Sequence, residues 1–240
     1  MTTERQQKLL EAEDSRFHAI GPVGTGLGMI ATTEKFGRKV VGFGLPSAPA
    51  LYLNVARGAH LRRAAIDVES VFVAHPPPQG TWPEIHSTLF DYFEHFACEV
   101  IFSFTALEAF ANEVVPSDFV YHFKSEKKAE PIALTKPDIE RRVSLDEKLK
   151  RVLPEAYKFQ SPSGTKVWQE YKVLKEVRDR LVHLKSIDRK SSGPEHQTLW
   201  GLMLEKRGVA FPDLAWHGMG HFQSLVKDRR WFKLYVPLTA

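Results

Sequence analysis

The sequence contains a single cysteine, Cys98, and no apolar run long enough to span a membrane. An internal disulfide is therefore excluded, and a reducing compartment is expected. A secretory leader would begin with a charged segment followed by an apolar one, whereas residues 1–8 are polar apart from Met1. Together these absences predict a soluble, cytoplasmic protein without a membrane partner.

Neither sign of charge dominates, because 33 Lys and Arg residues stand against 29 Asp and Glu residues, for a net charge of +4. This slight basic excess permits an anionic partner without requiring one. A hydrophobic content of 43% is ordinary for a globular protein, so extensive disorder is not expected. The 240 residues suffice for one large domain, or for a domain with attached segments.

Apolar residues recur at helical spacing in two long segments. In residues 83–115 they cover much of the helix circumference, which is typical of a helix in the middle of a bundle. In residues 167–184 every third or fourth position is apolar, which predicts a helix that buries one face. Further helices are predicted for residues 51–74 and 138–153, whereas residues 117–137 have a mixed pattern in which residues 125–130 are expected to form an exposed loop.

Both ends of the chain differ from this pattern. Gly21, Gly24, Gly26 and Gly28 precede two β-prone runs around Gly37, which predicts a hairpin, and their spacing does not fit a phosphate-binding loop. Residues 191–240 contain amphipathic stretches and are expected to form a helical extension packed on the bundle. The predicted fold is therefore mainly α, with an N-terminal extension in residues 1–50 and a helical bundle in residues 51–190.

The predicted helix in residues 167–184 carries chemically capable side chains near its end. Asp179 precedes His183 by one helical turn, so its carboxylate is expected to orient the imidazole, while Arg178 lies at the edge of the apolar stripe. Imidazole is the one side chain that titrates near neutral pH without perturbation. A solvated, charged helix face would give the same pattern without any chemistry.

Polar side chains also interrupt the most apolar helix. Thr105, Glu108 and Asn112 fall in one line at helical spacing. Burying an unpaired carboxylate costs several kcal/mol, so Glu108 requires a partner, and Arg178 is the predicted one. Such a pair would fix the register of the bundle, support catalysis, or do both.

Arg178, the polar Asp179 and His183 together resemble the Arg-polar-x-x-x-His motif of the HEPN (higher eukaryotes and prokaryotes nucleotide-binding) superfamily. The order of the other segments is also similar, with residues 103–113 in a long apolar helix, then residues 145–149, and then the motif helix. The resemblance covers roughly residues 85–185, and it implies a HEPN-like helical bundle.

The resemblance further implies a metal-independent endoribonuclease without a cofactor. In that mechanism His183 transfers protons, Arg178 stabilises the extra charge on phosphorus, and the 2′-hydroxyl of the RNA is the nucleophile. A homodimer in which two motifs form one site is implied, as is a toxin–antitoxin or phage-defence setting with an antitoxin or other partner protein. Predicted site residues are Arg178, Asp179 and His183 for catalysis, Glu108, Asn112 and Thr105 for support, and Arg180, Lys185, Arg229 and Arg230 for binding RNA.

Other interpretations stay open. A catalytically silent HEPN-like module would bind RNA or a protein and use Arg178 only to pair with Glu108. The glycine-rich N-terminal region would suit a sensor for a small ligand. His217 and His221 have the spacing of a metal-binding pair, but two glycines between them weaken the helix that this spacing assumes, and a third ligand is not evident. No metal site is therefore expected.

Overall fold

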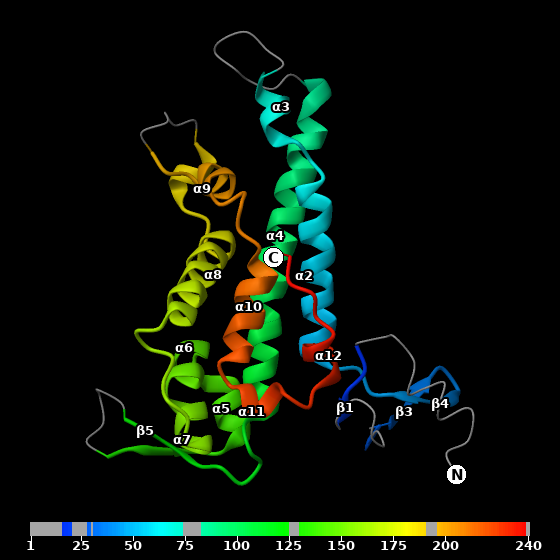
Figure 1. Cartoon of the computed structure of the whole chain (residues 1–240), viewed down its shortest axis with the longest axis vertical. Helices are drawn as coiled ribbons and strands as arrows, with labels where there is room; N and C mark the ends of the chain where they lie inside the picture. The colour runs from blue at the N-terminus through cyan, green and yellow to red at the C-terminus, as the bar shows by residue number, and fades with distance from the viewer. Residues whose placement is uncertain are drawn as a thin grey trace.

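The computed structural model of the chain describes residues 16–20, 28–29, 31–73, 83–124, 130–190 and 196–238. Its longest helix, α4 (Pro83–Val114), lies side by side with α2 (Ala48–Ala64) along the length of the molecule (Figure 1). Helices α8 (Lys166–Val182) and α10 (Phe211–Gly220) pack against α4 and against each other. The prediction of a mainly α fold with a small N-terminal hairpin and C-terminal helices is confirmed.

The remaining elements are short. They are β1 (Ala19–Ile20), β2 (Gly28–Met29), β3 (Ala31–Phe36), β4 (Lys39–Gly44), α3 (Val68–Val73), β5 (Tyr121–Phe123), β6 (Ile132–Leu134), α5 (Lys136–Arg142), α6 (Leu145–Glu147), the π-helical turn η1 (Lys148–Val152), α7 (Leu153–Tyr157), the 3-10 turn η2 (Ser186–Arg189), α9 (Leu199–Glu205), α11 (Gln223–Val226) and α12 (Arg230–Lys233). None of the helices among the described residues combines the length and apolar character needed to cross a membrane.

The predicted helix in residues 51–74 is two helices rather than one. Helix α2 begins after Ser47, whose hydroxyl accepts a hydrogen bond from the Ala50 N–H at 3.4 Å. It ends at Ala64, and α3 starts after Asp67, whose carboxylate accepts from the Ser70 N–H at 3.2 Å. The carboxylate of Asp67 thus accepts a backbone N–H that has no partner within the first turn of α3. This cap allows a new helix to start after Asp67.

Helix α10 brings the C-terminal segment into the core. Its Phe211, Ala215 and Met219 are fully buried. A Cβ atom on Gly218 would come within 3.3 Å of the Leu107 methyl groups, and one on Gly220 within 3.2 Å of the Phe232 ring. These glycines therefore allow close packing, and they do not interrupt the helix, because α10 includes Gly218 and ends at Gly220.

Helix α8 buries the predicted face, with Trp168, Tyr171, Leu174 and Val177 in the core. It starts after Thr165, whose hydroxyl accepts from the Trp168 N–H at 3.2 Å. It ends at Val182, before the predicted end of the stripe at Leu184, and the Leu184 side chain is 43% exposed. His183 is consequently the residue that caps the helix rather than a residue within it.

Two other segments lie between α4 and α8 in the sequence. Residues 117–137, which have a mixed pattern in the sequence, contain an antiparallel pair of strands, β5 and β6, and the loop predicted for residues 125–130 lies outside the described residues apart from Glu130. The predicted helix in residues 138–153 is divided, because α5 ends at Arg142 and the Ser144 hydroxyl then accepts from the Glu147 N–H at 3.3 Å to begin α6. The π-helical turn η1 follows directly.

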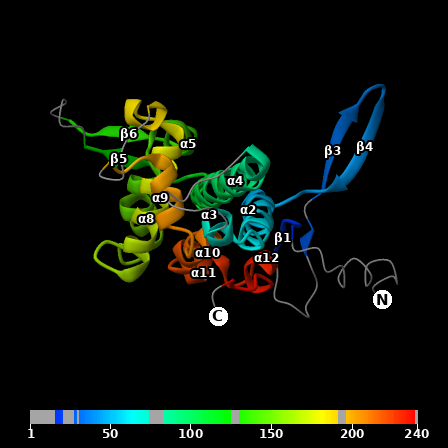
Figure 2. The same ribbon diagram turned by 90° about the horizontal axis from the view of Figure 1, so that it is seen from above.

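The N-terminal hairpin is confirmed as the antiparallel pair β3 and β4, which projects from the side of the bundle (Figure 2). Gly37 has a φ of +62°, which a two-residue hairpin turn requires and which glycine adopts without strain. The hairpin is exposed on both faces, and Phe36 and Val40 are 76% and 72% exposed. Gly28 lies in β2, whereas Gly21, Gly24 and Gly26 lie outside the described residues.

Candidate functional site

The motif arginine is held in place but open to solvent. Nη1 of Arg178 donates to Oδ1 of Asp179 at 2.9 Å, and the two side chains are 31% and 42% exposed. The Arg178 guanidinium also lies 4.6 Å from the ring centroid of Phe104 on α4, an attractive cation–π contact. Arg178 is thus an oriented positive charge that is partly exposed to solvent.

The predicted partners of this arginine and of the histidine are not formed. Arg178 and Glu108, both described by the structure, make no ion pair, because Arg178 lies at the level of Phe104, one turn earlier on α4. Among the described residues Asp179 makes no side-chain contact with His183 either, since its carboxylate binds Arg178. Only the Asp179 carbonyl contacts His183, accepting its backbone N–H at 2.9 Å.

His183 itself is exposed at the end of α8. Its backbone φ of −115° and ψ of 75° lie outside the helical region, so the chain changes direction at this residue. The apolar side chains on either side, Val182 and Leu184, are 48% and 43% exposed. The imidazole therefore stands on an accessible, partly apolar surface.

The line of polar residues on α4 faces a buried lysine instead of Arg178. Lys148 on η1 is fully buried, and its Nζ donates to Oδ1 of Asn112 at 2.7 Å and to the Glu140 carbonyl at 3.2 Å. Burial lowers the pKa of the Lys148 ammonium, and the charges of Glu108 and Glu140 oppose that shift. The sequence carried a signal for this, since Lys148 occupies the apolar stripe formed by Leu145, Leu149 and Val152.

Thr105, the third member of that line, bonds to its own helix. Its hydroxyl donates to the Ile101 carbonyl at 2.8 Å, a common arrangement for threonine inside a helix. The predicted supporting group is therefore divided: Asn112 and Glu108 lie near Lys148, and Thr105 is turned to the backbone of α4.

Arg180 is engaged by a buried carboxylate. Its Nη1 and Nη2 donate to the two oxygens of Asp188 at 2.9 and 2.8 Å, and the Asp188 side chain is 0% exposed. Backbone N–H groups of Lys185 and Leu199 donate to the same carboxylate, each at 2.7 Å. Burial raises the pKa of Asp188, but these donors outweigh it and lower the pKa to about 2.

This arrangement gives Arg180 a structural role, and its contact with RNA stays a prediction. It fastens the end of α8 to η2 and to the start of α9, where the Trp200 Nε1–H also donates to the Asp188 carbonyl at 3.1 Å. Lys185, the residue before η2, is exposed and stays accessible near His183.

The other two predicted RNA contacts lie elsewhere. Nη2 of Arg229 lies 3.0 Å from Oε1 of Glu113, in the last turn of α4, and Nη1 lies 3.1 Å from Nε2 of His18. Arg230 is the first residue of α12. Figure 1 shows α12 toward one end of the bundle and α9, which follows the motif, toward the other. The structure does not bring Arg229 and Arg230 together with His183.

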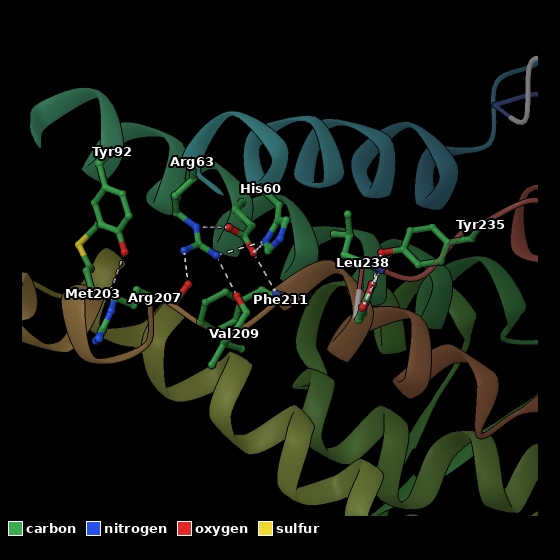
Figure 3. A network of polar contacts seen from close by, with 11 residues as sticks. His60, Arg63, Tyr92, Met203, Arg207, Val209, Phe211, Tyr235 and Leu238 are labelled. Atoms are coloured by element: carbon green, nitrogen blue, oxygen red, sulfur yellow. Dashed lines mark hydrogen bonds and ion pairs between the residues drawn. The ribbon is translucent and has the colours of Figure 1, made fainter. Parts of the chain in front are cut away.

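A second polar cluster, which sequence analysis missed, is sealed inside the bundle (Figure 3). Glu99 on α4 is 0% exposed, and its Oε2 accepts from Nε of Arg63 on α2 at 2.7 Å. Its Oε1 accepts from the Phe211 N–H at 3.0 Å and lies 2.9 Å from Nδ1 of His60. The Arg63 guanidinium also donates to the carbonyls of Arg207 and Val209, at 2.6 and 2.9 Å.

This cluster joins α2, α4 and the segment before α10 through groups that satisfy one another. Its only signals in the sequence are charged residues inside apolar stretches, and their partners are backbone groups far along the chain. Because the carboxylate of Glu99 and the guanidinium of Arg63 are closed off from solvent, the cluster is suited to holding the fold rather than to meeting a substrate.

Comparisons with protein-family models, with curated proteins and with solved structures find no match to this chain. Among the residues that the structure describes, there is also no group of three or more His, Cys, Asp or Glu side chains placed to hold a metal ion. The motif end of α8, with Arg178 and His183, is therefore the candidate functional site.

Proposed function

We propose that the protein is a metal-independent endoribonuclease of the HEPN type. The observation that carries this proposal is the pairing, within six residues of α8 and its cap, of an oriented, solvent-accessible guanidinium on Arg178 with an exposed imidazole on His183. The sequence resemblance to HEPN proteins supports the same reading.

The chemistry needs little from the protein beyond these two groups. The ribose 2′-oxygen attacks the adjacent phosphorus, the bond to the 5′-oxygen breaks, and a cyclic phosphate and a free 5′-hydroxyl result. The imidazole of His183 takes up or donates the proton that moves. The guanidinium of Arg178 stabilises the negative charge that develops on the phosphorus oxygens.

We further propose that two copies of the chain form one site. Cleavage requires a base for the 2′-hydroxyl and an acid for the 5′-oxygen, and one motif supplies a single imidazole. The exposed apolar side chains Val182 and Leu184 flank His183, and Trp200 on the neighbouring α9 is 43% exposed. Exposed apolar side chains gathered at one point favour contact with another protein surface. By resemblance, the setting is a toxin–antitoxin or phage-defence system with a partner protein.

The test is cleavage of RNA by the untagged protein in EDTA. We expect His183→Ala and Arg178→Ala each to lower the rate by about 100-fold or more, with cyclic phosphate ends in the wild-type product. The matched control is Lys172→Ala, which removes an exposed positive charge from the same helix. Full activity in His183→Ala would contradict the catalytic role.

A catalytically silent module that binds RNA or a protein is the second candidate. The observation that favours it is the Arg178–Asp179 pair, which offsets the charge of the arginine and leaves His183 without an orienting carboxylate. In this case RNA stays intact at high protein concentration, and Arg178→Ala weakens RNA binding only. Cyclic phosphate ends that disappear in His183→Ala would eliminate this candidate.

A further inference from the structure

A groove of about 470 Å³ lies where the start of α8 meets the end of α10. His217 and His221 both line it, together with Glu170 and the aromatic side chains of Trp216 and Phe232. Because α10 includes Gly218 and ends at Gly220, and His221 directly after it keeps helical backbone angles, the two histidines stand one turn apart on one helix face.

The hydrogen bond of His217 fixes the position of its proton. Nδ1 of His217 lies 2.9 Å from Oε2 of Glu170, and the other oxygen of this carboxylate is 3.5 Å from Nζ of Lys166. A carboxylate accepts hydrogen bonds, so Nδ1 carries the proton and donates. In the neutral ring the lone pair is then on Nε2.

The hydrogen bond of His221 places its proton on the other type of ring nitrogen, Nε2. Its Nε2 lies 3.0 Å from the carbonyl oxygen of Gln160, in the loop before α8. A carbonyl oxygen accepts hydrogen bonds, so Nε2 carries the proton, and the lone pair of the neutral ring is on Nδ1. Each imidazole therefore has one nitrogen engaged by an oxygen acceptor and one nitrogen with an available lone pair.

We propose that Nε2 of His217 and Nδ1 of His221 bind one divalent transition-metal ion, of the class of Zn²⁺, Cu²⁺ and Ni²⁺. Imidazole nitrogens suit these ions. Histidines that bind metals characteristically donate their other N–H to a carboxylate or a backbone carbonyl, and Glu170 and Gln160 supply those two acceptors. Since no third His, Cys, Asp or Glu of the described residues joins them, water or a bound ligand completes the coordination.

This site is separate from the one proposed for RNA cleavage. Glu170 lies in the first turns of α8, whereas Arg178 lies just before its last turn and His183 is its C-cap. The metal is therefore not part of the proposed cleavage chemistry, and loss of the metal site leaves cleavage in EDTA unchanged.

The experiment uses the untagged full chain, freed of metal with EDTA and then dialysed. Calorimetric titration with Zn²⁺ is expected to show one ion per chain. His217→Ala and His221→Ala should each raise the Kd by at least about 10-fold, and Glu170→Gln, which keeps both ligands, by about 10- to 100-fold. The control is His122→Ala, which removes an exposed histidine on β5 and should leave the Kd unchanged.

A second measurement counts the ligands and excludes simple unfolding. With Cu²⁺, the electron paramagnetic resonance spectrum should show coupling to two nitrogens in the wild type and to one in each single-histidine variant. Zn²⁺ should raise the melting temperature of the wild type but not that of the double variant, because an ion stabilises only a fold that binds it. Zn²⁺ binding that is unchanged in His217→Ala and His221→Ala would overturn the proposal.

Discussion

Two arginine–carboxylate pairs in this protein have the same chemistry and opposite surroundings. Arg63 and Glu99 are 2% and 0% exposed, and their polar atoms also bond to backbone groups of the segment before α10 and of its first residue, Phe211. Arg178 and Asp179 are 31% and 42% exposed, and the arginine packs over the ring of Phe104. Burial and complete hydrogen bonding mark the first pair as structural, whereas the exposure of the second pair makes it a candidate for binding and chemistry.

The largest effect on stability is expected from a substitution that breaks the buried pair. Glu99→Gln removes the charge that compensates Arg63 while nearly preserving shape, and it should lower the free energy of unfolding by about 3–5 kcal/mol, because it leaves an uncompensated charge in the core. Urea denaturation followed by circular dichroism measures this. Glu69→Gln is the matched control, since Glu69 pairs with Arg207 at the surface and should cost less than about 1 kcal/mol. Equal losses in the two variants would contradict the structural role of the buried pair.

An intermediate effect on stability is expected at Asp188, which is buried like Glu99 but lies beside the motif. Asp188→Asn should lower the free energy of unfolding at neutral pH by about 3 kcal/mol, because it removes the charge that pairs with Arg180. In the folded state the pKa of Asp188 is lowered to about 2, compared with about 3.9 for an unperturbed aspartate. The stabilisation by the carboxylate is therefore complete above about pH 4 and is lost as the pH falls toward 2.

The measurement is the free energy of unfolding between neutral pH and pH 3, for the wild type and Asp188→Asn. The wild type should lose stability more steeply below pH 4, so that the difference between the two proteins narrows. Parallel curves for the two proteins would show that Asp188 does not carry this pH dependence.

The smallest expected effect on stability is at the exposed pair. Arg178→Ala and Asp179→Asn should each change the free energy of unfolding by about 1 kcal/mol or less, because exposed ion pairs and exposed cation–π contacts contribute little. Urea denaturation of both variants, run beside the cleavage assay, checks this. A loss as large as that of Glu99→Gln would place Arg178 with the structural pairs and remove the basis for a catalytic role.

Much of the backbone followed from the sequence, because long apolar stripes are a local signal. Helices α4 and α8 and the hairpin around Gly37 were predicted from spacing and from one glycine. The division of the helix in residues 51–74 also has a local cause, the cap supplied by Asp67, which the apolar pattern concealed.

Side-chain partners were harder to predict, because they depend on how helices are positioned relative to one another. Glu108 was expected to pair with Arg178, but the rotation of α8 places that guanidinium over Phe104, and the π-helical turn η1 brings Lys148 to the same face of α4. The cluster around Arg63 depends on the backbone carbonyls of Arg207 and Val209. The sequence around Arg63 does not indicate that these distant carbonyls are its partners.

The exposed ribbon of β3 and β4 has a consequence for how the stability of this protein is measured. Two strands without a covering layer have little stability of their own, and neither face of this ribbon is covered. Its amide protons should exchange with deuterated water far sooner than those of α4, since local opening there does not require the helices to separate. A single melting temperature would then describe the helices, and the ribbon would need an amide-exchange experiment of its own.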